Sequence, residues 1–454
     1  MKILKIIHGY PPEYNAGSEV YSQSICNEFI KHHEVILFSR EENEYAPDFS
    51  FRESITAHGV RHFVVNMPRG KDGYNHPKLN QKFSQLIDKI KPDIAHIGHL
   101  NHLSIGIVDV LHDNKIPIVC TLHDFWLMCP RGQFLQRNFD GEHLFRLCKK
   151  QKNSECAKRC YSMYFSNYEM SFDQSLFYEF SHSEHIGKDK LSDLEHWTNW
   201  IDARMFAMKQ ICEKIDLFVA PSKYLMNRFI NDFRLPESKI VYLDYGFPTH
   251  YLRPVIPKEN GIYTFGYIGT HVPAKGINLL IEAFKKVSGN TKLKIFGREQ
   301  GQNTLALKKM SQDCKNEIEF CGEYINENLA ITVFNHVNCI VVPSIWAENS
   351  PLVIHEAQSC RIPVITADFG GMAEYLNDHV NGLLFKHRDE NDLAAKLQYA
   401  IEHPQLMKQL GERGYLYSED GSVPDIGQHC ESLTKIYSQL IRENHENRIL
   451  ANHA

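Results

Sequence analysis

The feature that most constrains the fold is a repeated alternation of short apolar runs with amphipathic helical stretches. Lys2–His8 and Glu34–Ser39 are typical strands, and the helix predicted between them has Tyr21 and Phe29 on one side. A second alternating set begins at Tyr263. Such alternation with short connections predicts an α/β architecture of doubly wound parallel sheets, which bind ligands at the carboxyl ends of their strands.

The chain has 454 residues, more than one hydrophobic core usually organises. We predict an N-terminal Rossmann-like domain at 1–248 and a C-terminal one at 249–422, facing each other across a cleft. A C-terminal helix at 423–454 is expected to return to the N-terminal domain. Residues 125–200 break the alternation and are interpreted as an insertion on the cleft side of the N-terminal domain.

Composition narrows the class of protein. An apolar content of 43% and a charged content of 23% are typical of soluble globular chains, and a net charge of −5 argues against nucleic-acid binding. No run reaches the roughly 18 apolar residues of a membrane span, and the N-terminus lacks a signal cleavage site. We therefore expect a cytoplasmic chain whose twelve cysteines are thiols or metal ligands.

The stretch 338–356 predicts a ligand site. Cys339–Val342 is an unbroken apolar run typical of a buried strand, and Pro351 is suited to begin a helix. Backbone N–H groups at a helix start favour an anionic ligand. Glu348 in the loop and Glu356 in the helix are then placed to hold hydroxyls beside that anion. The local pattern fits an ordinary strand and helix with two solvated acids equally well.

Two glycine turns precede predicted helices. Gly17 can let the backbone approach a phosphate or sugar, although a plain tight turn explains it as well. Gly269 to Gly276 follows a strand and places Lys275 near a helix start, where a bound pyrophosphate would explain a cation; a solvated lysine is the alternative. The glycine patterns of dinucleotide dehydrogenases and P-loop enzymes do not occur.

Four motifs occur in order, and together they resemble glycosyltransferase family 4, the retaining nucleotide-sugar transferases of the GT-B fold. The motifs are Gly269-…-Lys275-Gly276, Glu348-Asn349-Ser350-Pro351-Leu352-…-Glu356, Gly370-Gly371-Met372-Ala373-Glu374 and Asn381-Gly382-Leu383-Leu384. Thr121-Leu122-His123-Asp124 and Ala220-Pro221-Ser222 also resemble the family. The match covers nearly the whole chain outside 125–200 and is most specific from 263 to 400.

The resemblance implies roles for individual residues. Lys275 would bind the donor diphosphate, Glu356 the ribose hydroxyls, and Glu348 would lie against the transferred sugar. His123 would face the reacting centre, although a lone histidine after a strand is more often structural. The residues predicted to bind the donor are Gly17, Thr270, Lys275, Arg298, Asn349, Ser350, Pro351, Leu352 and Glu356, and the predicted catalytic residues are His123 and Glu348.

One departure from the family pattern concerns charge. Thr270 stands where the family commonly has arginine, so we predict that Arg298 substitutes for it. The family mechanism is usually taken as same-face displacement, in which the leaving diphosphate helps to deprotonate the acceptor. Glu348 would then position and stabilise without acting as a covalent nucleophile, and no metal or other cofactor would be required for catalysis.

The insertion carries two further features. Cys129, Cys148, Cys156 and Cys160 fit a structural zinc site, with free thiols as the alternative. The insertion is also rich in basic residues, which either form a solvated face or contact a lipid phosphate or the membrane surface. These residues are Arg131, Arg146, Lys149, Lys150, Lys152, Lys158 and Arg159.

The sequence thus predicts a retaining glycosyltransferase. It would move a sugar from a nucleoside diphosphate to a hydroxyl of a glycan or lipid-linked acceptor in cell-surface polysaccharide or glycolipid synthesis, with peripheral contact to the cytoplasmic membrane. The alternatives are a sugar-nucleotide epimerase or hydrolase of the same fold, and a non-catalytic binding protein. The base, sugar, acceptor and linkage are not identified by the sequence.

Overall fold

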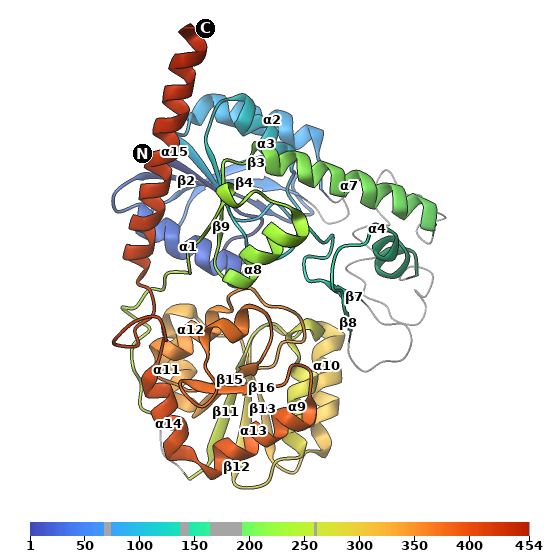
Figure 1. Cartoon of the computed structure of the whole chain (residues 1–454), viewed down its shortest axis with the longest axis vertical. Helices are drawn as coiled ribbons and strands as arrows, with labels where there is room; N and C mark the ends of the chain where they lie inside the picture. The colour runs from blue at the N-terminus through green and yellow to red at the C-terminus, as the bar shows by residue number, and fades with distance from the viewer. Residues whose placement is uncertain (68–73, 137–144, 164–192, 258–260, 454) are drawn as a thin grey trace.

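The N-terminal domain, the upper of the two in Figure 1, is built on an eight-stranded sheet in the order β10-β9-β6-β5-β1-β2-β4-β3. The computed structural model describes residues 1–67, 74–136, 145–163, 193–257 and 261–453. The strands are β1 (Lys2–Ile6), β2 (Glu34–Glu41), β3 (Phe51–Ile55), β4 (Arg61–Asn66), β5 (Ile94–Ile97), β6 (Ile118–Thr121), β9 (Leu217–Ala220) and β10 (Ile240–Tyr242). All pair in parallel except β3, which runs antiparallel to β4 at the sheet edge.

Helices cover this sheet and bury their apolar faces against it. They are α1 (Gly17–Phe29), α2 (Pro77–Ile90), α3 (Gly106–Asp113), α7 (Leu194–Lys214) and α8 (Lys223–Arg228), the last continued by a π-helical turn at Phe229–Phe233. A short 3-10 turn at Glu237–Lys239 precedes β10. In α1, Tyr21, Ile25 and Phe29 are buried, as their four-residue spacing predicts.

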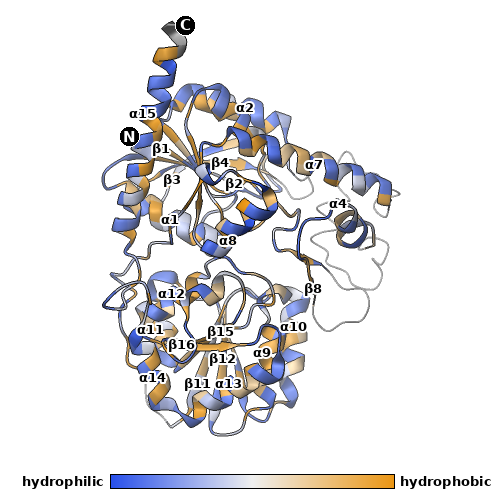
Figure 2. Ribbon diagram, in the orientation of Figure 1, coloured by the Kyte–Doolittle hydropathy of each residue, from blue (hydrophilic) through white to orange (hydrophobic). Residues whose placement is uncertain are grey.

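The C-terminal domain has a six-stranded, wholly parallel sheet in the order β13-β12-β11-β14-β15-β16. Its strands are β11 (Tyr263–Ile268), β12 (Thr291–Phe296), β13 (Glu317–Gly322), β14 (Cys339–Val342), β15 (Val364–Ala367) and β16 (Gly382–Phe385). Its helices are α9 (Ile277–Lys285), α10 (Gly301–Met310), α11 (Leu329–Thr332), α12 (Leu352–Ser359), α13 (Glu390–Glu402) and α14 (Pro404–Arg413), with 3-10 turns at Pro273–Lys275, Ser311–Asp313, Asn326–Asn328, Phe334–His336 and Gly370–Tyr375. Strands of both sheets are mainly hydrophobic, and the covering helices mix hydrophobic with hydrophilic residues (Figure 2).

The last helix, α15 (Ile426–His453), lies along the N-terminal domain although the chain reaches it from the C-terminal domain (Figure 1). It packs on α1, and the Tyr437 hydroxyl lies 2.6 Å from Nδ1 of the buried His96 in β5. Just before α15, Asp425 forms a β-bridge with Phe247, which lies in the segment that connects the two sheets. The predicted boundary at 248/249 falls within that connection and stays a prediction.

The inserted segment has little regular structure where it is described. It contains a two-stranded antiparallel sheet of β7 (Leu135–Gln136) and β8 (Arg146–Leu147). The short helix α4 (Asn153–Glu155) and a π-helical turn at Cys156–Ser162 follow. Residues 137–144 and 164–192 of the predicted insertion lie outside the described residues. None of the helices in the described ranges is long and apolar enough to cross a membrane.

Candidate active site

Two helix starts, one from each domain, adjoin at the carboxyl edges of the sheets. Helix α1 begins at Gly17 and α12 follows Pro351, and no side chain caps either start. A methyl group added to Gly17 would lie 3.7 Å from the Leu352 side chain, so the two starts face each other across the domain junction. Uncapped N–H groups from two helices therefore converge on one place, which favours an anion there.

Lys275 and Glu348 meet beside these helix starts. The Lys275 ammonium donates to Oε1 of Glu348 at 2.7 Å, and the same oxygen accepts from the Ser344 hydroxyl at 2.6 Å and the Trp346 indole at 2.9 Å. The Glu348 side chain is 7% exposed and that of Lys275 is 35% exposed. The carboxylate is thus fixed by three donors, whereas the ammonium remains accessible to a ligand.

A glycine makes the approach of the Lys275 loop possible. Gly276 has a φ of +72°, and a Cβ there would come within 2.0 Å of the Pro343 carbonyl oxygen after β14. Only glycine avoids that clash in this conformation. The Lys275 loop and the Glu348 loop are consequently packed backbone to backbone.

Glu356 lies one turn inside α12 (Leu352–Ser359). Burial raises its pKa from 4.5 to about 7. Its negative charge in turn raises the pKa of Tyr251 and Tyr324, although burial is the larger cause for both. The site therefore contains a carboxyl group that ionises near neutral pH and would gain from hydroxyl donors.

Asn349 and Ser350 join the domains in this structure. The Ser222 hydroxyl donates to Oδ1 of Asn349 at 2.7 Å, and Nδ2 of Asn349 donates to the Leu122 carbonyl at 3.0 Å. The Ser350 hydroxyl donates to Asp244 at 3.4 Å. The predicted donor-binding role of these two side chains remains a prediction, and their visible contacts are between the domains.

His123 is partly buried, two residues after the end of β6. Its Nδ1 lies 2.6 Å from the Tyr245 hydroxyl, and its ring stacks on that of Tyr245 with centroids 5.7 Å apart. Within the described residues its Nε2 is buried without a hydrogen-bond partner. Burial, assisted by the charge of Lys5, lowers its pKa well below 6.5, so the ring is neutral at pH 7.

Thr270 and Arg298 stand on neighbouring loops. The His271 amide donates to the Arg298 carbonyl at 3.0 Å, and Gly297 lies directly against Gly269. The Arg298 side chain is exposed. The two loops are thus close enough for Arg298 to take the place predicted for it, and its contact with a donor stays a prediction.

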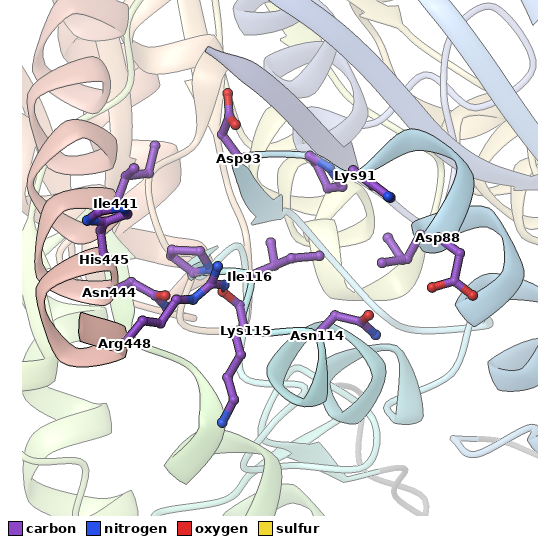
Figure 3. Close-up of a pocket in the computed structure, with 13 residues that line it drawn as sticks. Asp88, Lys91, Asp93, Asn114, Lys115, Ile116, Ile441, Asn444, His445 and Arg448 are labelled. Carbon is purple, nitrogen blue, oxygen red and sulfur yellow. The ribbon is translucent and has the colours of Figure 1, made fainter. Parts of the chain in front are cut away.

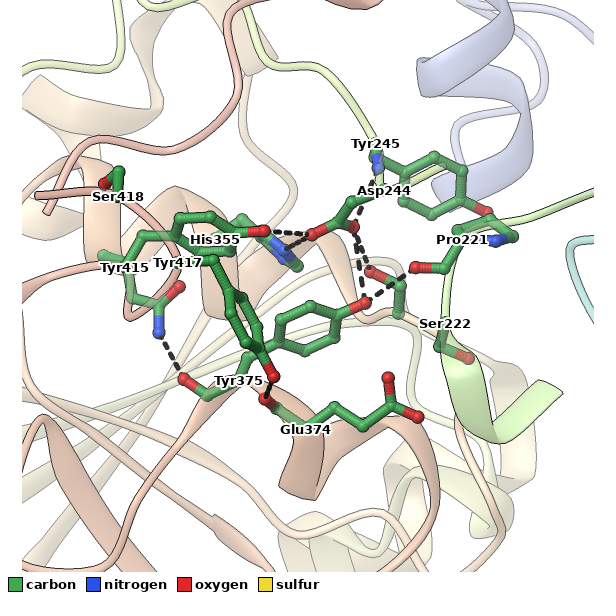
Figure 4. Close-up of polar contacts among 12 residues, drawn as sticks. Pro221, Ser222, Asp244, Tyr245, His355, Glu374, Tyr375, Tyr415, Tyr417 and Ser418 are labelled. Atoms are coloured by element: carbon green, nitrogen blue, oxygen red, sulfur yellow. Dashed lines mark hydrogen bonds and ion pairs between the residues drawn. The ribbon is translucent and has the colours of Figure 1, made fainter. Parts of the chain in front are cut away.

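A buried carboxylate with no predicted role lies at the domain junction. Asp244 lies in the connection after β10 and accepts hydrogen bonds from His355 at 3.1 Å, Tyr415 at 2.7 Å and Tyr375 at 3.3 Å (Figure 4). The Tyr245 amide adds a bond at 2.8 Å and the Ser350 hydroxyl one at 3.4 Å. No local pattern marks Asp244, because its side-chain partners are more than 100 residues away in sequence.

Glu374 is a second residue whose role was missed, although it ends one of the quoted motifs. Its carboxylate accepts from the backbone N–H groups of Lys223, at 2.9 Å, and Tyr224. It therefore caps the start of α8 in the opposite domain. Burial raises the pKa of this carboxyl group.

The four cysteines of the insertion line one hollow of about 550 Å³ between the β7–β8 pair and the turn at Cys156–Ser162. None of them forms a disulfide. Among the described residues no group of three or more His, Cys, Asp or Glu side chains is arranged to hold a metal ion. Zinc binding by Cys129, Cys148, Cys156 and Cys160 therefore stays a prediction.

Metal analysis tests the zinc prediction. We expect about one zinc per purified chain, and Cys156→Ser combined with Cys160→Ser should remove it and lower the melting temperature. Cys314→Ser, in the other domain, is the control and should keep the zinc. Zinc-free wild type whose melting temperature is unchanged by added zinc or a chelator would refute the prediction.

A separate hollow of about 420 Å³ lies at the amino edge of the first sheet, beneath α15 (Figure 3). Asp93, Lys115 and Arg448 are among the residues that line it. It is at the opposite end of the strands from the paired helix starts and contributes nothing to the candidate site.

Comparison with known proteins follows the same division into domains. Residues 16–156 match the family model described as Glycosyltransferase Family 4, and residues 252–417 match the model described as Glycosyl transferases group 1. An uncharacterized glycosyltransferase of Methanocaldococcus jannaschii is 31% identical over 246 residues, which cover 53% of this chain and 64% of that protein. The capsular polysaccharide biosynthesis glycosyltransferase CapM of Staphylococcus aureus is 25% identical over 254 residues, which cover 52% of this chain and 66% of CapM.

The fold has solved counterparts. The Anabaena protein HepE, in complex with UDP and glucose, superposes with a TM-score of 0.65 at 14% identity and covers 96% of this chain and 99% of its own. Two facing Rossmann-like domains of this kind define the GT-B class. Within that class, the chain belongs to glycosyltransferase family 4. Each alignment to the curated relatives above spans just under two thirds of the relative's length.

Proposed function

We propose that this chain transfers a sugar from a nucleoside diphosphate to a hydroxyl of a glycan or lipid-linked acceptor, with retention of anomeric configuration. The observation that carries the proposal is the convergence of two uncapped helix starts and the accessible Lys275 ammonium at the domain junction. A diphosphate there would receive backbone hydrogen bonds and one positive charge.

In the proposed reaction the bond between the anomeric carbon and the diphosphate oxygen breaks, and its electron pair leaves with the diphosphate. The acceptor oxygen forms the new bond on the same face, and its proton passes to the departing diphosphate. Lys275 and the helix N–H groups stabilise the negative charge that develops there. Glu348, held by Ser344 and Trp346, would receive hydroxyls of the transferred sugar and act as a positioning group.

The nature of the acceptor is supported from two directions. The relative CapM is named as a glycosyltransferase of capsular polysaccharide biosynthesis. In this chain, the insertion has four exposed lysines, Lys149, Lys150, Lys152 and Lys158. A basic surface of this kind would meet a lipid phosphate at the cytoplasmic face of a membrane. We therefore propose a polysaccharide or glycolipid acceptor that is presented at such a surface.

A turnover experiment tests the proposal. Purified protein is screened against nucleoside diphosphate sugars by thermal shift, and the sugar nucleotide that binds is then followed by proton NMR with membrane lipid extracts as acceptor source. We expect nucleoside diphosphate release and a product with the donor's anomeric configuration. An inverted product, or a product formed equally without acceptor, would overturn the proposal, and the absence of any binding would favour a non-catalytic protein.

Glu356→Gln should weaken donor binding while it stabilises the free protein at alkaline pH. Because burial raises the pKa of Glu356 from 4.5 to about 7, the folded state loses stability as pH rises from 4.5 through 7. That loss is at most about 3 kcal/mol for a shift of this size, and partial solvent contact reduces it. We expect the variant to melt roughly 1–3 °C higher than wild type at pH 8 and equally at pH 4.5.

Donor affinity should show the opposite trend with pH. Ribose hydroxyls donate to the ionised carboxylate, so wild-type affinity should fall below pH 7 and the variant should bind about tenfold more weakly at pH 8. Glu282→Gln, on the surface of α9, is the matched control. If Glu356→Gln binds donor like wild type at pH 8, Glu356 does not hold the ribose.

A further inference from the structure

Two histidine–carboxylate pairs lie together at the carboxyl edge of the first sheet. Nε2 of His8, just after β1, lies 3.2 Å from Oε1 of Glu19 in the first turn of α1. Nε2 of His99, after β5, lies 3.3 Å from Oδ1 of Asp124, after β6. The two imidazole rings meet edge-on with centroids 4.6 Å apart. Both pairs are close enough to His123 for His8, Glu19 and His99 to influence its pKa.

The two histidines differ in what their other ring nitrogen does. Nδ1 of His99 accepts a hydrogen bond from the Asn101 amide at 3.0 Å, so both of its nitrogens have partners. Nδ1 of His8 is buried and has no hydrogen-bond partner in the ranges that the structure describes. A buried polar atom without a partner is unfavourable, and a ligand that supplies one would bind there.

The protonation of the pair fixes what kind of ligand fits. Burial lowers the pKa of His8, an effect that Glu19 opposes and that His99 and Arg40 reinforce, so the ring is neutral at pH 7. Burial alone would raise the pKa of Glu19, but the attraction and hydrogen bonds of His8 and Ser18 lower it, so the carboxylate is ionised. The neutral ring donates its one N–H from Nε2 to Glu19 and leaves Nδ1 as an acceptor.

An acceptor nitrogen on a ring whose other nitrogen is paired with a carboxylate favours a hydroxyl over a phosphate. A sugar hydroxyl donates one hydrogen bond and carries no charge, whereas an ionised phosphate has no proton to donate and would meet the negative charge of Glu19 on the same ring and of Asp124 on the neighbouring His99. Glu19 and Gly17 occupy the same first turn of α1, and Gly17 faces Leu352 at the start of α12. The nitrogen is therefore next to the place proposed for the donor.

We propose that Nδ1 of His8 binds a hydroxyl of a neutral acceptor sugar and that Glu19 holds the histidine in the required tautomer. The inference rests on the proposed function and adds the acceptor's chemical class and the residue that recognises it. The bound hydroxyl orients the sugar, so that a neighbouring hydroxyl attacks the anomeric carbon and gives its proton to the departing diphosphate.

Two substitutions separate recognition from packing. Asn at position 8 places its amide oxygen near the position that Nδ1 of His8 has in the wild type, whereas Gln places its amide nitrogen near the position of Nε2. We expect His8→Asn to keep acceptor-dependent turnover within about threefold of wild type. His8→Gln keeps a hydrogen-bond donor to Glu19 but loses the hydrogen-bond acceptor at the place of Nδ1. It should therefore raise the KM for the acceptor sugar about tenfold, which corresponds to the loss of one hydrogen bond. His112→Gln, on the surface of α3, is the control.

The assay uses the sugar nucleotide found by thermal shift, with p-nitrophenyl glycosides as neutral acceptors and sugar phosphates as charged ones. We expect the neutral glycosides to accelerate nucleoside diphosphate release and the donor KM to be equal in all variants. A lower acceptor KM for His8→Gln than for His8→Asn would assign His8 a packing role. Acceleration by sugar phosphates alone, or by neither class, would overturn the acceptor class.

The two failures are distinguishable. Wild type that binds no sugar nucleotide refutes the proposed function itself. Wild type that binds and turns over a donor while His8→Gln matches it in acceptor KM refutes only the role of His8. A further readout is pH: the acceptor KM of wild type should rise as pH falls and His8 is protonated, and the acceptor KM of His8→Asn should not change.

Discussion

Lys275→Ala should lower kcat/KM for the sugar nucleotide by roughly 10²–10³-fold, the cost of removing one group that stabilises developing charge. The resemblance assigns the Lys275 ammonium to the donor diphosphate, and this ammonium donates a hydrogen bond to Glu348. Its loss also removes one of three donors to Oε1 of Glu348, while Ser344 and Trp346 continue to hold that carboxylate. We therefore expect the variant to fold like wild type but to transfer the sugar much more slowly.

The measurement is steady-state nucleoside diphosphate release, with the melting temperature as a check on folding. Lys286→Ala, at the C-terminal end of α9, the helix that follows the Lys275 turn, is the matched control, because its ammonium pairs with Glu390 on the surface. We expect the control to keep wild-type kinetics and Lys275→Arg to recover part of the lost activity. Equal kinetics for Lys275→Ala and Lys286→Ala would show that the ammonium does not act on the donor.

Asp244→Ala should destabilise the protein by roughly 3–5 kcal/mol, the cost of removing one partner from a buried charged network. The carboxylate is 7% exposed and is the common acceptor for His355, Tyr375 and Tyr415 (Figure 4). Alanine leaves His355 and Tyr415 buried without this acceptor, whereas Tyr375 can still donate to the Pro221 carbonyl at 2.8 Å. Because the network ties the connection after β10 to α12, its loss should also loosen the domain junction.

The pH dependence of this effect has a definite sign. Burial alone would raise the pKa of Asp244, but His355, Tyr415 and the Tyr245 amide lower it below 3.8. The stabilisation from the carboxylate is then complete above the unfolded pKa near 3.8 and is lost as pH falls through the folded pKa. Asp244→Asn should thus lose less stability than Asp244→Ala and depend less on acid.

Urea unfolding at pH 7 followed by tryptophan fluorescence measures both variants. Asp232→Ala is the matched control, because Asp232 forms a surface ion pair with Arg228 and should change stability by less than about 1 kcal/mol. A loss of under 1 kcal/mol for Asp244→Ala would show that the network contributes little to folding.

Local patterns predicted the strands better than the connections between them. The unbroken apolar run Cys339–Val342 is β14 with the predicted bounds, because strands buried on both faces admit few polar residues. The second alternating set begins with β11 at Tyr263, as predicted. Strand β3 was missed, since Phe51–Ile55 is an antiparallel edge strand with exposed charges. Helix α14 was not predicted, although Pro404 stands at its first turn, where proline commonly begins a helix.

The candidate site shows the same limit. Motif spacing located Lys275, Glu348 and Glu356, but not the contact between the first two, which joins residues 73 positions apart. The same holds for Asp244 and for the cap that Glu374 provides to α8. Contacts between distant segments depend on how the domains pack, and a single sequence carries no periodic signal for that. The His8–Glu19 pair likewise forms only when β1 and α1 are packed together.

The central claim is that a nucleoside diphosphate sugar binds at the domain junction, where the backbone N–H groups at the starts of α1 and α12 and the Lys275 ammonium contact its diphosphate. Calorimetric titration of wild type and Lys275→Ala with a panel of sugar nucleotides tests it most directly. The account predicts that one sugar nucleotide binds wild type with a micromolar Kd and binds Lys275→Ala at least tenfold more weakly. Equal affinity for the two proteins, or no binding to wild type by any member of the panel, would contradict it.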